Sequence, residues 1–149
     1  MSNNQDEKAF NILEKAVYKA QTSLEQTKYF QPFLMLLNDA GEIEIFENEV
    51  KDSTESYTLL EETVKTRISN DNDIDIMVLV VDTLIPDKFV EDVPSGIRLH
   101  LEEKSQVDNK IGARFLYVPY DLRRVGDGEM FVQLHAPIPV GFPAEYIVK

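Results

Sequence analysis

Two adjacent arginines, Arg123 and Arg124, follow Tyr120 and Asp121 in the segment YDLRR. A guanidinium group donates paired hydrogen bonds that match a carboxylate or a phosphate. In so acidic a chain these cations can instead neutralise nearby carboxylates or stabilise a contact between subunits. We interpret Tyr120, Arg123 and Arg124 as candidate residues for binding a ligand or a partner.

Two runs of alternating residues, 96–103 and 113–120, predict a β-hairpin whose register can be argued from side-chain character. Pairing Leu101 with Phe115 places apolar residues beside apolar ones along the pair. A shift by one residue would set apolar residues against charged ones. We therefore expect the first register.

In that register one face of the hairpin combines polar and aliphatic side chains. Arg98, His100 and Arg114 share this face, and we add them to the candidate binding residues. We expect the tail to cover part of it, because residues 130–135 can form a strand and residues 136–143 form an extended, proline-rich apolar ribbon.

The sequence contains few of the histidine and cysteine side chains that commonly bind a zinc ion. His100 and His135 are the only histidines and there is no cysteine, which excludes three-histidine and cysteine-based zinc sites. A site of both histidines with Glu102 stays open if the tail crosses the hairpin. Serine-nucleophile, phosphate-loop and dinucleotide motifs are missing, so we expect no catalytic residues, metal or cofactor.

The composition limits the binding partners and the cellular location that we expect for the protein. The chain has 149 residues, with 27 acidic against 15 basic ones and a net charge of -12, which would repel a nucleic-acid backbone. Residues 1–8 lack the order of a secretory signal, and no apolar run approaches the roughly 20 residues that span a bilayer. We expect one domain over residues 1–149, a cytoplasmic location, and neither nucleic acid nor membrane as a partner.

Hydrophobic periodicity predicts the elements that position these residues. The first helix has an apolar stripe that we expect to pack on a sheet, formed by Phe10, Leu13, Val17, Ala20 and Leu24. The predicted elements before the hairpin are a helix at residues 6–26, strands at 33–37 and 42–45, a helix at 53–69 and a strand at 74–81.

The strand at residues 74–81 is apolar on both faces, with Asp75 as the only polar residue. Two apolar faces need two covering layers, and we expect both helices to cover the same face. The other face must then meet the C-terminal tail or a second copy of the chain. This strand is the main reason to expect a homodimer.

Together these elements predict an α+β fold. We expect an antiparallel five- to six-stranded sheet with helices on one face, in the order α-β-β-α-β-β-β, followed by the extended proline-rich tail. Over about residues 6–120 this order resembles that of the profilin-like group, including roadblock and longin domains. In that group a five-stranded antiparallel sheet carries helices and often serves as a binding or dimerising platform, so the resemblance concerns the fold alone.

We interpret the chain as a non-enzymatic homodimeric binding or scaffold protein. Charge and size also allow an acidic inhibitor or immunity-type protein that docks a basic protein partner. A third reading is a small ligand-binding protein or enzyme that uses Arg123 and Arg124, with Tyr120 and His100, beneath the tail.

Overall fold

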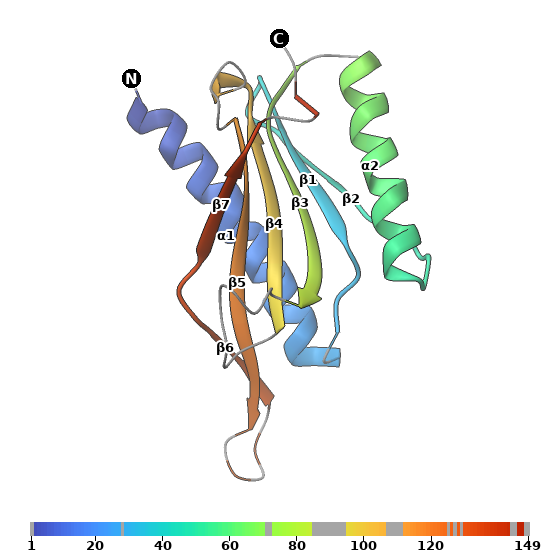
Figure 1. The fold of residues 1–149 in the computed structure, drawn as a ribbon, viewed down its shortest axis with the longest axis vertical. Coiled ribbons are helices and arrows are strands. Elements are labelled where there is room, and N and C mark those ends of the chain that lie inside the picture. Colours follow the sequence, from blue (N-terminus) through green and yellow to red (C-terminus); the bar gives the residue numbers. More distant parts are fainter. Residues whose placement is uncertain are drawn as a thin grey trace.

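The computed structural model describes residues 2–27, 29–70, 73–84, 95–106, 112–124, 126, 128, 130–143 and 146–147. These residues form two helices, seven strands and a short 3-10 helix at Lys104–Gln106 (Figure 1). The main elements are α1 (Ser2–Thr27), β1 (Phe33–Asn38), β2 (Ile43–Phe46), α2 (Ser53–Asn70), β3 (Ile74–Leu84), β4 (Ser95–Glu103), β5 (Ala113–Arg124), β6 (Met130–Leu134) and β7 (Ile138–Phe142). The predicted α+β class and the order α-β-β-α-β-β-β are confirmed.

The strands form one antiparallel sheet in the order β2-β1-β3-β4-β5-β6, with β7 also paired to β5. Strand β5 is long enough to hold two partners on one edge: residues 113–117 pair with β7 and residues 120–124 with β6. The proline-rich ribbon therefore contains a strand, and the sheet has seven strands rather than five to six. Proline is tolerated in β7 because an edge strand has a row of N–H groups that needs no ladder partner.

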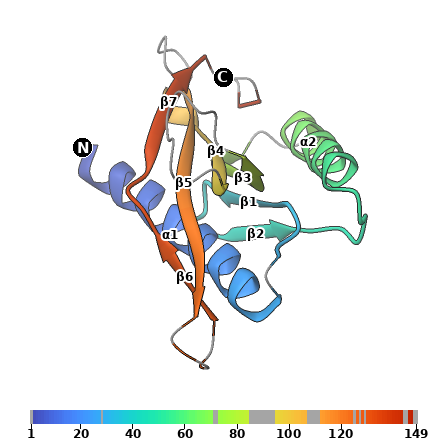
Figure 2. The same cartoon turned by 60° about the horizontal axis from the view of Figure 1, so that its bottom comes forward.

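Helix α1 packs on one face of the sheet and α2 on the other (Figure 2). The prediction that both helices cover the same face is wrong. Strand β1 explains the arrangement, because it is apolar at successive positions and its side chains alternate between the faces. Phe33 and Met35 belong to the core beneath α1, and Leu34 and Leu36 to the core beneath α2.

Strand β3 is also buried on both faces within the single chain. The core beneath α1 contains Ile76, Val78 and Val80, and the core beneath α2 contains Met77 and Leu79. Tyr146 and Ile147 from the tail complete the second core. Because α2 and the tail supply the layer that we expected from the tail or a second copy, β3 gives no reason to expect association.

The β4–β5 register is shifted by one residue from the predicted one. Leu101 lies opposite Arg114, and His100 lies opposite Phe115. The predicted register is wrong because it allowed the Phe115 ring to lie opposite an aliphatic residue only. In the structure the His100 and Phe115 rings meet edge to face, with centroids 5.3 Å apart, so an aromatic residue can lie opposite a polar one without loss of contact.

Candidate binding site

Helix α1 packs on the sheet through a stripe of mostly small residues, namely Ala9, Ile12, Ala16, Ala20 and Leu24, all of which are buried. Alanine adds only a methyl group between the helix and the sheet, so the two backbones approach closely. Three other large apolar residues of α1 lie beside this stripe, on the flank of the helix. Phe10, which we expected in the core, is 60% exposed, while Leu13 and Val17 are only partly buried.

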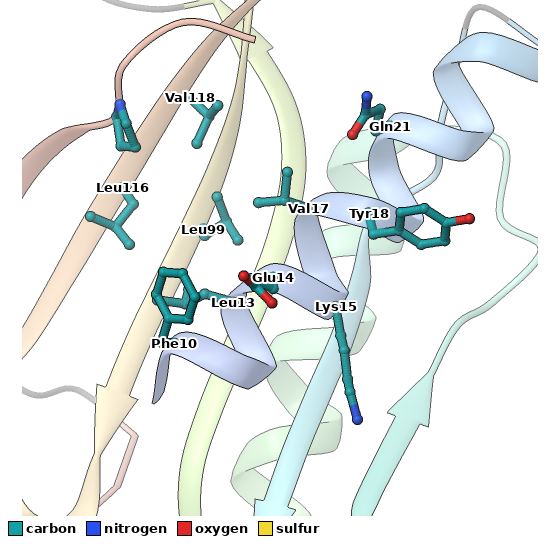
Figure 3. Close-up of a pocket in the computed structure, with 11 residues that line it drawn as sticks. Phe10, Leu13, Glu14, Lys15, Val17, Tyr18, Gln21, Leu99, Leu116 and Val118 are labelled. Carbon is teal, nitrogen blue, oxygen red and sulfur yellow. The ribbon is translucent and has the colours of Figure 1, made fainter. Parts of the chain in front are cut away.

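An apolar groove of about 750 Å³ lies between this flank and the sheet. Figure 3 shows Phe10, Leu13 and Val17 of α1 pointing toward side chains of β4 and β5. The strand side of the groove is formed by Leu99, Leu116 and Val118, and Pro137 between β6 and β7 also lines it. We call this feature the α1 groove.

The groove exists because α1 packs chiefly on β1, β3, β4 and β6 and leaves part of β5 open. Leu116 of β5 is therefore only partly buried. A concave surface with an almost entirely apolar lining and this volume is typical of binding sites. The lining favours contact with an apolar group over acid–base chemistry.

Tyr18 is the most exposed large side chain of α1, at 70%. Tyr18 also lines the α1 groove, and its ring extends to the side of the helix away from the strand side chains (Figure 3). The face that contains the α1 groove therefore also carries a projecting aromatic ring, so it has both a concave and a convex apolar feature.

The predicted site residues do not meet in one place. Tyr120 is buried on the α1 side of the sheet, where its hydroxyl donates a 2.8 Å hydrogen bond to Asp82 Oδ1. Burial raises the pKa of Asp82, and the bond from Tyr120 acts in the opposite direction. Burial and the bond to Asp82 raise the pKa of Tyr120, so this hydroxyl remains protonated and engaged at neutral pH.

Arg123 lies near the end of β5 and is exposed, with its guanidinium 3.7 Å from the carboxylate of Asp121. The same carboxylate lies 2.9 Å from His135 Nε2. The side chain of Arg124 lies outside the described residues. The described part of this cluster thus consists of local side-chain contacts at a strand end.

The remaining candidates are divided between the two faces of the sheet. Arg98 and His100 face the α2 side, whereas Arg114 is exposed on the α1 side opposite Leu101. His100 Nε2 lies 2.7 Å from Glu102 Oε2, so the two histidines have different carboxylate partners. Among the described residues, no group of three histidine, aspartate or glutamate side chains could hold a metal ion, which removes the two-histidine site with Glu102.

Sequence reasoning missed the α1 groove although its helical residues were recognised as an apolar stripe. The stripe does not reveal whether its residues are inside a core or beside it. The available signal was the set of alanines on the adjacent stripe, which allows the helix to lie close to the sheet and leaves the larger side chains at the edge.

Within the described residues, neither helix has the length and apolar character needed to cross a lipid bilayer. Comparison of the chain with known protein families, characterised proteins and solved structures finds no significant match.

Proposed function

We propose that this protein is a non-enzymatic homodimeric binding or scaffold protein whose two copies associate through the face that contains the α1 groove. The observation that carries the proposal is the exposure of apolar side chains around a groove of about 750 Å³. Phe10 and Tyr18 are both large and mostly exposed. Contiguous exposed apolar surface of this kind typically marks an interaction site.

A second copy suits this face because a two-fold dimer needs one surface that is complementary to itself. The α1 groove is the concave half of such a surface and Tyr18 is the convex half. In the proposed dimer, Tyr18 of each copy enters the α1 groove of the other. Tyrosine provides a large contact area at a small entropic cost and is enriched at the energetic centres of interfaces.

The test is sedimentation velocity over a range of protein concentrations. We expect a concentration-dependent dimer for the wild type and a monomer for both Tyr18→Lys and Phe10→Lys. Tyr29→Lys is the matched control, because Tyr29 is an exposed tyrosine outside α1 and receives the same charge change. Circular dichroism checks that each variant is folded. A wild type that stays monomeric at the highest concentrations contradicts the proposal.

A mixture of the two variants tests the geometry itself. Tyr18→Lys loses the projecting ring, which also lines the α1 groove, but keeps Phe10, Leu13 and Val17 there. Phe10→Lys keeps the ring and introduces a charge among the side chains that point toward the strands. When these variants pair with each other, one of the two reciprocal contacts keeps both the Tyr18 ring and the Phe10, Leu13 and Val17 side chains of the groove. We expect a heterodimer that is weaker than the wild-type dimer, and dimers that form equally in all samples would contradict the arrangement.

The volume of the groove favours a second candidate function, the binding of a small apolar ligand. Ligand pockets commonly occupy about 300–1,000 Å³, a range that includes the α1 groove. In this case an apolar fluorescent probe should bind to the monomer. Phe10→Lys should weaken binding more than Tyr18→Lys does, because Phe10 points toward the strand side of the groove, whereas the Tyr18 ring, which also lines the groove, extends away from that side. If the groove is a dimer interface, dimerisation should compete with the probe.

Docking to a basic protein partner rests only on the net charge of -12 and stays a prediction. Binding between oppositely charged surfaces weakens as salt screens the attraction. Both proposed uses of the α1 groove rest on apolar contacts, so the salt dependence of binding distinguishes a basic partner from them.

A further inference from the structure

Arg98 occupies an unusual position on the α2 side of the sheet. Its neighbours in β4, Ile97 and Leu99, are buried on the α1 side, so strand alternation directs Arg98 to the opposite face. There its guanidinium carbon lies 4.5 Å from the centroid of the Phe115 ring and 5.3 Å from that of the Tyr57 ring. One strand and one helix thus hold the cation in place.

The guanidinium has no anionic partner among the described residues. Its Nε atom is buried and lacks any hydrogen-bond acceptor there. Arg67, by contrast, pairs with Glu44 at 2.9 Å and with Asp73 at 2.8 Å. A buried donor without an acceptor costs free energy, more so on a charged group, and such a group in a native protein calls for a physical reason.

Contacts with aromatic rings do not use the hydrogen-bonding capacity of an arginine. The rings attract the flat faces of the guanidinium, whereas its N–H donors lie in the plane and point outward from the edges. Phe115 and Tyr57 therefore restrict the orientation of the side chain and accept none of its N–H hydrogen bonds. A restrained, planar set of donors matches the geometry of an oxyanion.

The nearest carboxylate along β4 does not serve this purpose. Glu102 is fully buried, and its two oxygens are occupied by His100 and by backbone N–H groups of the tail. An anion that approaches Arg98 from outside therefore meets a cation that this carboxylate does not neutralise.

We propose that Arg98 binds an oxyanion, either a carboxylate or a phosphate group of a small ligand, with Phe115 and Tyr57 fixing the guanidinium. The site lies on the opposite face of the sheet from the α1 groove and does not depend on the proposed dimer.

The test follows the Nε–H resonance of Arg98 by NMR in the wild-type protein, assigned with Arg98→Lys. Sodium phosphate and sodium acetate are titrated separately, with sodium chloride at equal ionic strength as the reference. We expect a saturable shift of this resonance with at least one of the two oxyanions and none with chloride. The more effective oxyanion identifies the preferred group.

Arg114 is the matched control, because it is an exposed arginine of the same hairpin on the other face of the sheet. Its resonance should show only a weak, non-saturating response. Arg98→Lys keeps the charge and loses the planar donors, so we expect oxyanion affinity, followed by backbone resonances of β4 and β5, to fall about tenfold or more, while Arg114→Lys leaves it unchanged. No saturable shift in the wild type, or equal responses at Arg98 and Arg114, would overturn the proposal.

Discussion

His100 Nε2 lies 2.7 Å from Oε2 of Glu102, and both side chains are buried on the α2 side of the sheet. The other carboxylate oxygen of Glu102 accepts hydrogen bonds from the backbone N–H groups of Tyr146 and Ile147, at 2.9 and 3.0 Å. The hydroxyl of Tyr146 also donates to Glu61 of α2. A buried carboxylate in β4 thus holds the tail against the core beneath α2.

Glu102→Ala should be strongly destabilising. The substitution removes the acceptor of two buried N–H groups and the partner of His100, and each buried donor left without an acceptor costs about 1–3 kcal/mol. Glu102→Gln keeps an acceptor oxygen and should cost less. Urea unfolding measures both, with Glu62→Gln on the exposed surface of α2 as a control that should stay within about 0.5 kcal/mol of wild type. Equal stabilities of Glu102→Ala and Glu62→Gln would contradict this role of the carboxylate.

The pair formed by Asp82 and Tyr120 should make stability depend on pH. Burial raises the pKa of Asp82 in the folded protein, so the folded state binds this proton more tightly than the unfolded chain does. The resulting stabilisation is complete below the unfolded pKa, about 3.9, and is lost as the pH rises through the folded value. The free energy of unfolding of the wild type, relative to that of a variant with an uncharged residue at position 82, should therefore decrease toward neutral pH.

Asp82→Asn tests this prediction because it keeps an acceptor for Tyr120 and cannot ionise. Urea unfolding between about pH 4 and 7 should give a wild-type curve that falls relative to that of Asp82→Asn. Tyr120→Phe removes the bond that lowers the pKa of Asp82, so this pKa should rise further. The decrease in stability of the Tyr120→Phe variant should therefore extend to higher pH. Parallel curves for wild type and Asp82→Asn would show that the carboxyl group does not titrate differently on folding.

The elements of this fold could be predicted from the sequence because each has a local cause. The alternation of apolar residues in β3 and the helical spacing from Phe10 to Leu24 are visible without knowledge of the partners. The side that each element covers is not local. Helices α1 and α2 lie on opposite faces because β1 and β3 are apolar on both sides. The sequence pattern does not indicate which helix packs on which face.

The site was harder to predict because its parts come from distant segments. The groove needs Phe10 of α1 and Leu116 of β5, whose proximity follows from how α1 crosses the sheet. The shifted register had a similar effect: it moved Arg114 to the face opposite Arg98, and so divided a predicted cluster. Side-chain type alone did not indicate that His100 would lie beside the Phe115 ring.

The turn between β1 and β2 depends on Gly41, whose φ angle of 87° is unfavourable for residues with a Cβ atom. Asn38 Oδ1 accepts hydrogen bonds from the N–H groups of Ala40 and Glu42 and fixes the turn around it. A Cβ atom at residue 41 would meet no other group within 4 Å, so only backbone strain opposes a substitution. Gly41→Ala should cost about 1–2 kcal/mol in urea unfolding, and Gly41→Asn less, because asparagine tolerates positive φ. Equal losses for both variants would point to a cause other than the backbone angle.

The close contact of α1 with the sheet depends on its alanines, and Ala16 is completely buried there. Ala16→Leu should force the helix away from the strands or its own side chain into a strained rotamer, and overpacking of this kind typically costs about 1–3 kcal/mol. Asn11→Leu introduces the same side chain at an exposed position of α1 and should change stability by no more than about 0.5 kcal/mol. Thermal and urea unfolding compare the two variants. If Ala16→Leu is as stable as Asn11→Leu, the helix has room above the sheet, and the small residues of its inner stripe cannot be the reason that Phe10, Leu13 and Val17 lie beside the groove.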